Sequence, residues 1–363
     1  MHCHLLVPGF GWPQGEANEV CHPLAPDALE TLISRGRRSC APAFGTERWL
    51  LERFGVPRQR DWPAAPFSLI AEGGTPGSDT WICADPVHLR IERDRLMLAD
   101  STLFRIARDE AEGLARSINS HFGDSLIVYP MQPQRWYARL PACPDMETTP
   151  LSLVRGGAIE ARLARGPEAM RWQAFANELQ MLLHDHPVNL ARESRGELPV
   201  NSVWLWGAGR LPPRPARPPA RAPARPLARP FQHVAASDPL ARGLAQASGA
   251  QARELAANAQ AWLAQECGAA GGAGHARIGL IVLDSLAAPL QYGQADAWRE
   301  ALSQLELNWF VPLLAALKQG TIGMLTVHLL GLEHALRVEV THSDLRRFWR
   351  RRQPLAGWLA RAT

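Results

Sequence analysis

One stretch of the chain, residues 278–283, constrains the fold more than any other. It reads Ile-Gly-Leu-Ile-Val-Leu and contains no polar side chain. A strand with one face in water alternates apolar and polar residues, so this uninterrupted run predicts a strand covered on both faces, in the middle of a parallel sheet. Segments with the 3.6-residue apolar period of helices lie between this and other short apolar runs. The sequence therefore predicts an α/β fold, with a mostly parallel sheet flanked by helices.

The remaining elements are expected from apolar runs and helical periodicity. Further strands are expected at residues 4–7, 67–70, 125–129, 136–140, 202–206, 322–327 and 336–341. The last of these alternates apolar and polar side chains, which favours an antiparallel or edge strand that closes the sheet. Helices are expected at residues 110–120, 167–184, 241–267 with a break at Gly249, 296–304, 308–319 and, with Ser343 as N-cap, 344–352.

Composition and the cysteine pattern narrow the class of protein. Of the 363 residues, 46% are hydrophobic and 20% charged. This supplies enough apolar material for a sizeable core and excludes a disordered or collagen-like chain. No apolar run reaches the roughly 18 residues of a membrane-spanning helix, and the first residues lack the pattern of a secretory leader. The six cysteines are scattered without a CxxC pair. We expect a cytoplasmic protein with reduced thiols and no membrane partner.

Residues 211–230 differ from the rest of the chain because proline and arginine alternate with almost nothing to bury. This composition predicts an extended, polyproline-like surface loop. It could be a basic tether for nucleic acid or an acidic partner. The favoured alternative is a solvated loop that reflects an arginine-rich composition, since Lys318 is the only lysine. Residues 344–352 are also rich in arginine, and we interpret them as a basic surface helix, with a nucleic-acid patch as the alternative.

The amino-terminal region contains side chains that could bind a borderline metal. They are His2, Cys3, His4, Cys21, His22 and Cys40. On a strand His2 and His4 share a face while Cys3 points the other way, and the paired spacing of a zinc finger is missing. The sequence therefore predicts no metal site here.

A polar segment between residues 184 and 210 is the main candidate for ligand binding. It ends in a strand followed by Gly-x-Gly, and the carboxyl edge of a parallel sheet is where α/β proteins bind ligands. The candidate ligand-binding residues are His186, Asn189, Arg192, Asn201, Gly207, Gly209 and Arg210. The two arginines and two asparagines could hold a carboxylate or phosphate. The alternative role of the asparagines is hydrogen bonding to backbone in turns. The sequence contains no Walker, Gly-x-Gly-x-x-Gly or Gly-x-Ser-x-Gly motif.

The same segment carries a family resemblance. Residues 186–189, which read His-Pro-Val-Asn, and residues 199–210 resemble a stretch of the archaeal-type cofactor-independent phosphoglycerate mutases that reads roughly HPxN…R…G…PxNxxWxWGxG. Residues 84–95, 110–114 and 234–245 extend the resemblance. Within this superfamily the chain is most similar to proteobacterial regulatory proteins of the RpfE type.

The resemblance implies an alkaline-phosphatase-like core, formed by residues 1–78 and 166–363 and including the loop 211–230. It implies a smaller α/β domain inserted at residues 79–165. In the active mutases two divalent metals lie at the carboxyl edge of the sheet, with a serine nucleophile. Here Pro8-Gly9 stands where the family has Asp-Gly, and only His328 remains of a later Asp-His pair. The ligand loop after the central strand retains one aspartate, Asp284.

These differences predict a non-catalytic, metal-site-depleted protein with a regulatory or partner-binding role and no cofactor. Its partner would be an unidentified protein or a small anionic ligand. The alternative is a metal-dependent phosphoryl-transfer enzyme, of mutase or phosphatase type, with a rebuilt site. Such an enzyme would use Asp284, Ser285 and His328 with manganese or zinc.

Overall fold

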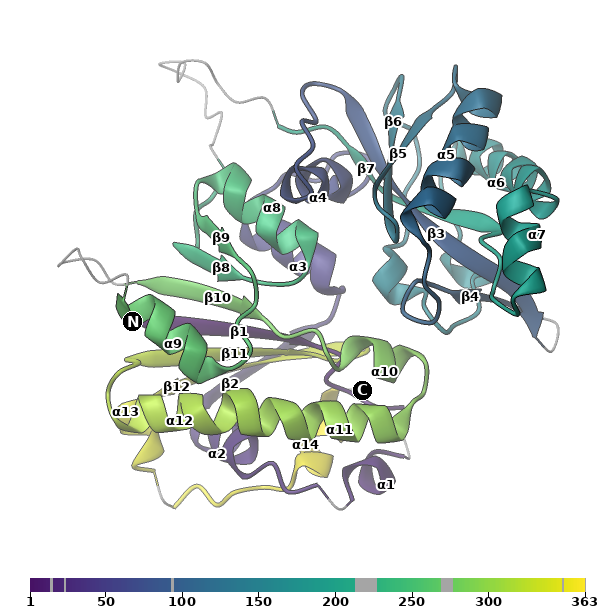
Figure 1. Cartoon of the computed structure of the whole chain (residues 1–363). Helices are drawn as coiled ribbons and strands as arrows, with labels where there is room; N and C mark the ends of the chain where they lie inside the picture. Colours follow the sequence, from purple (N-terminus) through teal and green to yellow (C-terminus); the bar gives the residue numbers. More distant parts are fainter. Residues whose placement is uncertain are drawn as a thin grey trace, which may run out of the picture. The chain divides into compact units, whose positions relative to one another are not determined.

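The computed structural model describes residues 1–13, 16–22, 24–92, 95–212, 227–268, 277–347 and 349–362. The chain divides into two compact units (Figure 1). Unit 1 contains residues 1–46, 229–245 and 249–363, and unit 2 contains residues 47–228 and 246–248. Most of the loop expected at 211–230 lies outside the described residues.

Unit 1 contains a seven-stranded sheet in the order β2-β12-β11-β1-β10-β8-β9. Strands β1, β8, β9, β10 and β11 are parallel, whereas β12 and β2 are antiparallel. The bounds are β1 His2–Pro8, β2 Arg37–Pro42, β8 His233–Ala235, β9 Gln251–Arg253, β10 Ile278–Val282, β11 Met324–Leu330 and β12 His334–Thr341. The mostly parallel sheet and the central position of β10 confirm the α/β prediction. The prediction of an antiparallel strand at residues 336–341 is confirmed by β12. The edge strand is β2, so the expectation that this strand closes the sheet is wrong.

One face of this sheet carries the core of unit 1. Cys3, Leu5 and Val7 of β1 point into it and are fully buried. The helices of the unit are α1 Ala17–Cys21, α2 Asp27–Arg35, α8 Pro239–Ser248, α9 Ala259–Gly268, α10 Ala287–Gln291, α11 Ala295–Leu305, α12 Val311–Lys318, α13 His342–Leu345 and α14 Leu355–Ala362. The other face of β1 carries His2 and His4, because side chains alternate along a strand. The sheet therefore has one apolar face and one face with several polar groups.

A π-helical segment, η3 (Glu306–Phe310), connects α11 to α12 without a break. Glu306 in this segment is buried, and its carboxylate accepts hydrogen bonds from the backbone nitrogens of Ala28 at 2.5 Å and Leu29 at 3.2 Å. Burial raises the pKa of Glu306. The carboxylate lies at the amino-terminal end of α2, where it satisfies donors that have no partner within that helix.

Unit 2 contains a five-stranded antiparallel sheet with the order β4-β3-β6-β5, in which β7 pairs with β3. The strands are β3 Thr80–Glu92, β4 Arg95–Ala99, β5 Ile127–Gln132, β6 Arg135–Leu140 and β7 Ser202–Gly209. The helices are α3 Thr46–Arg53, α4 Ala64–Ala71, α5 Arg108–Phe122, α6 Ala169–His184 and α7 Pro187–Ser194, with short 3-10 turns η1 Leu151–Leu153 and η2 Glu160–Arg162. Ile82 and Trp136 from the sheet and Leu114 and Leu179 from α5 and α6 share one core.

Several expected elements differ from the structure. Within the helix expected over residues 241–267, residues 251–253 form the strand β9 and the second helix, α9, begins at Ala259. Residues 67–70 lie in the helix α4, because a short apolar run fits a buried helix as well as a strand. Residues 202–206 do form a strand, but it belongs to unit 2. The last expected helix, 344–352, is reduced to α13, which begins after Thr341 and ends at Leu345. The segment expected as an insertion, 79–165, lies wholly within unit 2, which begins at residue 47. No described helix combines the length and the apolar character needed to cross a bilayer.

Candidate functional site

The parallel strands of unit 1 end at one edge of the sheet. There Gly9 follows β1, while Asp284 and Ser285, which are both exposed, follow β10. Gly9 has a φ of 83°, and a Cβ atom at this position would lie 2.5 Å from the backbone of Leu286. Trp298 Nε1 donates a hydrogen bond to the Gly9 oxygen at 2.9 Å. Only glycine fits this close approach of two strand ends.

His328 lies within β11, two residues before the end of the strand. It is 4% exposed, and its Nε2 lies 3.1 Å from Nδ1 of His4, which is 8% exposed. The two rings are stacked, with centroids 5.4 Å apart. A hydrogen bond between two imidazole nitrogens uses a single proton, so each ring commits one nitrogen to the other.

His2 continues this row of rings. Its centroid lies 4.1 Å from that of His4, and its Nε2 is 2.9 Å from Oγ1 of Thr326. Burial lowers the pKa of His2. Cys3 points to the opposite face and packs in the core, as the strand alternation predicts. The three histidines thus form a line on one face of the sheet.

The residues at this edge do not fit a two-cation centre. Such a centre needs several carboxylates and imidazoles that converge on the metals. Within the described part of the chain, no group of three or more His, Cys, Asp and Glu side chains could hold a metal ion. The facing nitrogens of His4 and His328 are hydrogen-bonded to each other.

The polar segment of residues 184–210 lies in unit 2, where many of its side chains bind the protein itself. His186 caps α7, because its Nδ1 accepts a hydrogen bond from Val188 N at 3.2 Å. Its Nε2 therefore carries the proton and donates to Ser117 Oγ at 2.9 Å. Burial lowers the pKa of His186.

The two asparagines bind backbone groups. Asn189 is 1% exposed and bonds Leu183 O and Val200 O through Nδ2 and Val200 N through Oδ1. Asn201 makes a matching pair of bonds to the nitrogen and oxygen of Leu89, both at 2.8 Å. These contacts correspond to the backbone-bonding role that the sequence left open. Ligand binding by these asparagines stays a prediction.

Arg192 likewise forms its hydrogen bonds within unit 2. It is 1% exposed, and its Nη1 lies 2.6 Å from the carboxylate of Glu110. Its Nε donates to Leu198 O at 2.8 Å and its Nη2 to Arg105 O at 2.9 Å. The guanidinium therefore joins α7 to the segment that precedes α5 and to α5 itself.

Gly207 and Gly209 allow α4 to pack closely against β7. Gly207 has a φ of 71°, and an added Cβ would lie 2.9 Å from Cβ of Ala64. At Gly209 it would lie 2.5 Å from Cβ of Pro63. Arg210 Nε donates to Thr80 Oγ1 at 2.7 Å. The glycines that suggested a ligand loop thus serve contact between a helix and a sheet.

A buried polar cluster on β3, β6 and β7 was not predicted. Asp85 is 2% exposed, and its Oδ2 accepts a hydrogen bond from Trp206 Nε1 at 2.7 Å. Arg135 lies 3.5 Å from Oδ1, which has no hydrogen-bond partner among the described residues. Burial raises the pKa of Asp85, against the opposing effects of Arg135 and Trp206. The sequence signal was a carboxylate in a strand that is otherwise apolar from residues 81 to 84.

Tyr137 lies next to this cluster, opposite Cys83 in the sheet. Its ring is fully buried, and its hydroxyl has no hydrogen-bond partner within the described part of the chain. Burial raises its pKa well above the ordinary value. Asp85 and Tyr137 are therefore two neighbouring groups that the fold holds in surroundings unfavourable to their charged forms.

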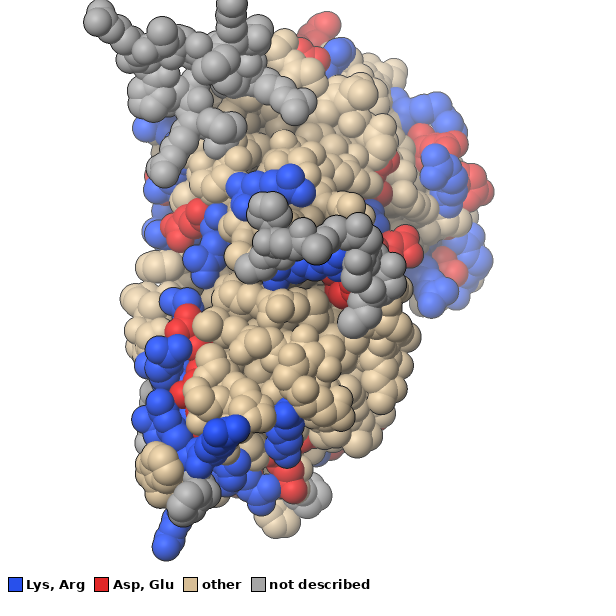
Figure 2. Space-filling model, turned by 90° about the vertical axis from the view of Figure 1, so that its left-hand side faces the viewer, with Lys and Arg blue, Asp and Glu red and all other residues tan. Residues whose placement is uncertain are grey.

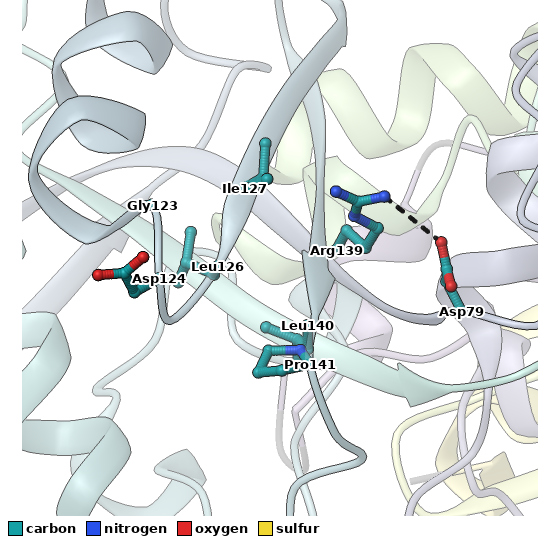
Figure 3. Close-up of a pocket in the computed structure, with 8 residues that line it drawn as sticks. All are labelled: Asp79, Gly123, Asp124, Leu126, Ile127, Arg139, Leu140 and Pro141. Atoms are coloured by element: carbon teal, nitrogen blue, oxygen red, sulfur yellow. Dashed lines mark ion pairs between the residues drawn. The ribbon is translucent and has the colours of Figure 1, made fainter.

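Unit 2 also contains a pocket of about 290 Å³ (Figure 3). Its lining consists of Asp79, Gly123, Asp124, Leu126, Ile127, Arg139, Leu140 and Pro141. Arg139 Nη1 points to Asp79 at 3.6 Å, and Asp124 lies on the other side of Leu126 (Figure 3). The lining thus contains two carboxylates and one guanidinium.

Comparison with known proteins gives partial matches. No family model matches the chain. The chain is 31% identical over 197 residues to a probable 2,3-bisphosphoglycerate-independent phosphoglycerate mutase of Geobacter sulfurreducens, covering 51% of this chain and 49% of that protein. It is 30% identical over 199 residues to the corresponding mutase of Methanosarcina mazei, covering 51% and 48%. The matched segment thus spans about half the length of these relatives.

A solved structure shows the same fold. The PH0037 protein from Pyrococcus horikoshii superposes with a TM-score of 0.52 at 13% identity, over 94% of this chain and 87% of that chain. The two relatives are named as phosphoglycerate mutases that do not depend on 2,3-bisphosphoglycerate, so the resemblance to this family is confirmed over the matched half of the chain. The more specific resemblance to RpfE-type regulators stays a prediction.

Proposed function

We propose that this protein is a non-catalytic relative of the cofactor-independent phosphoglycerate mutases and acts by binding a partner. The observation that carries the proposal is the hydrogen bond between His4 Nδ1 and His328 Nε2, 3.1 Å long and buried. This bond occupies Nε2 of His328, the one histidine retained where the family resemblance implies a metal ligand. The proposal includes a regulatory role of RpfE type, a cytoplasmic location, and an unidentified protein or small anionic ligand as partner.

The test combines metal content with activity. The purified protein is analysed for bound metal and assayed with 3-phosphoglycerate and p-nitrophenyl phosphate, with and without added manganese. We expect no stoichiometric metal and no turnover. Near-stoichiometric metal with turnover that disappears in His328→Ala, but not in the control His184→Ala, would sink the proposal. His184 is a suitable control because its side chain is 82% exposed on α6.

The second candidate is a metal-dependent phosphoryl-transfer enzyme, which the activity of the curated relatives favours. Asp284 and Ser285 are exposed beside Gly9 at the carboxyl edge of the sheet, where they could meet a substrate. Loss of turnover in both Asp284→Asn and Ser285→Ala, with an unchanged unfolding transition, would support this candidate.

A further inference from the structure

The open edge of the large sheet is unusually basic. β2 is the last strand in the order and pairs with β12 on one side. All six of its residues are exposed, and it begins with Arg37 and Arg38. Exposed edge strands often carry charges that prevent pairing with another chain. Here the charges continue on a second segment of the chain.

Arg350 lies against the residues that precede β2. Arg350 Nη1 donates hydrogen bonds to Gly36 O at 3.0 Å and to Arg35 O at 3.3 Å. In return, Arg35 Nη1 donates to Leu345 O at 2.8 Å. These bonds hold two arginine-rich segments, more than 300 positions apart in the sequence, side by side in unit 1.

Several of these arginines form no close ion pair with a carboxylate of the described residues, although Arg37 helps to lower the pKa of Asp344. The group consists of Arg35, Arg37, Arg38, Arg346, Arg347, Arg350, Arg351 and Arg352. Arg347 pairs with Asp344 at 3.1 Å, and Arg352 pairs with Asp27 and Glu30. Within the described residues, no ion pair with a carboxylate forms at Arg37, Arg346 or Arg351, all exposed. Figure 2 shows blue side chains gathered with fewer red ones toward the lower left of the viewed face.

Aromatic rings accompany this charge. Trp349 is 66% exposed and lies in sequence between Arg347 and Arg350. Phe44, two residues after β2, is 51% exposed. Proteins that bind single-stranded nucleic acid combine arginines for the phosphates with aromatic rings on which bases stack.

We propose that this surface, with Arg37, Arg346, Trp349 and Arg351 as its main contacts, binds single-stranded nucleic acid with little sequence preference. The arginines would bind phosphates and Trp349 would stack on a base. An acidic peptide would use the same charges but would have less use for the exposed ring. The inference goes beyond the proposed function, because this surface would bind whether or not the protein catalyses a reaction.

The first test uses charge reversal on the full-length protein. Binding of a fluorescent oligothymidylate of about 20 nucleotides is followed by anisotropy over a range of salt concentrations. We expect Arg37→Glu/Arg346→Glu/Arg351→Glu to weaken binding about tenfold or more and to reduce the slope of log affinity against log salt by about 2. The matched control, Arg105→Glu/Arg116→Glu/Arg162→Glu, makes the same change at exposed arginines of unit 2 and should bind like the wild type. Equal losses in the two variants would overturn the proposal.

The second test separates stacking from charge. Trp349→Ala leaves the charge unchanged and should weaken binding of the oligothymidylate about fivefold or more, with the unfolding transition unaltered. Deleting residues 213–226, the arginine-rich part of the loop, should preserve binding. If Trp349→Ala has no effect and poly-glutamate competes as well as the oligonucleotide, the surface binds acidic chains and the proposal fails. It also fails if the loop deletion abolishes binding.

Discussion

At the scale of single residues, Arg192 and Arg195 share the carboxylate of Glu110 but lie in different surroundings. Both arginines approach it at 2.6 Å. Arg192 is 1% exposed, whereas Arg195 is 48% exposed. A buried charge that loses its partner is costly because water cannot replace it, while an exposed pair contributes little. Loss of Arg192 should therefore reduce the free energy of unfolding more than loss of Arg195.

We expect Arg192→Ala to lower the free energy of unfolding by about 3–5 kcal/mol, since it leaves the exposed Arg195 as the ion-pair partner of Glu110 and removes the donor to two buried backbone oxygens. Arg195→Ala should cost about 1 kcal/mol or less. Urea unfolding of both variants measures this difference. Similar losses in the two variants would show that the buried network does not stabilise unit 2.

Asp85 provides a pH-dependent prediction. Because burial raises its pKa above the ordinary 3.8, the fold favours the protonated form. This contribution to stability is fully present below the unfolded-state pKa and is lost as the pH rises through the folded-state value. Asp85→Asn is neutral at every pH, so its free energy of unfolding should rise relative to the wild type as the pH increases above about 4. Urea titrations at several pH values test this, with the exposed Asp124→Asn as control; a difference that is constant with pH contradicts it.

At the scale of elements, the contact between α4 and β7 depends on Gly207. Gly207 and Gly196 have nearly the same φ, 71° and 72°. An added Cβ meets Ala64 at 2.9 Å at position 207, but nothing within 4 Å at position 196. The pair therefore separates backbone strain from overpacking.

Alanine at either position should lower the free energy of unfolding by about 1–2 kcal/mol, because its backbone must adopt a left-handed conformation. Gly207→Ala should lose a further 1–3 kcal/mol or so from crowding between α4 and β7. Thermal or urea unfolding measures both, and adding Ala64→Gly to Gly207→Ala should restore part of the loss. No recovery in the double variant would mean that the helix does not rest on this glycine.

The π-helical segment supplies a cap to another helix. Glu306→Ala removes the acceptor for Ala28 N and Leu29 N and should destabilise unit 1 by about 1–2 kcal/mol. Glu306→Gln keeps an acceptor oxygen and should cost less. Glu300→Ala, at an exposed position of α11, is the control. The expected order of destabilisation is Glu306→Ala, then Glu306→Gln, then Glu300→Ala. Urea unfolding curves that give another order would contradict the capping role.

Sequence patterns predicted the elements whose buried faces can be recognised from the apolar residues of the segment itself. Residues 278–283 are apolar throughout because β10 is covered on both faces. Residues 67–70 show the limit of this reasoning, since four apolar residues fit a strand or a helix and the packing of α4 decides. β2 was missed because Arg-Arg-Ser-Cys-Ala-Pro is exposed along its whole length. Asp85 was missed as a site residue because its partners Arg135 and Trp206 come from strands that only the fold places beside it.

At the scale of the whole molecule, the two units differ in how the chain enters them. Unit 1 is assembled from segments at both ends of the sequence, whereas nearly all of unit 2 is the continuous stretch 47–228. The family resemblance implied a domain inserted at residues 79–165, and these limits stay a prediction. A local sequence pattern does not tell which of the two sheets β7 joins. Its pairing with β3 is a contact between positions about 120 residues apart.

A fragment of residues 47–228 should therefore fold on its own. It contains a five-stranded sheet, its helices and one shared core, which is more than enough for a domain of this size. We expect cooperative urea unfolding and a circular dichroism spectrum with both helix and strand. A fragment that stays unfolded would show that unit 2 depends on the rest of the chain.

The arginines along β2 also affect how copies of this protein behave toward one another in concentrated solution. Two sheets that met edge to edge through β2 would bring Arg37 and Arg38 of each copy together, and like charges oppose such pairing. Salt screens this repulsion, with a Debye length of about 10 Å at 0.1 M and about 3 Å at 1 M. Colloidal stability should therefore fall as salt is added, and a bound polyanion that neutralises the edge would remove the same protection.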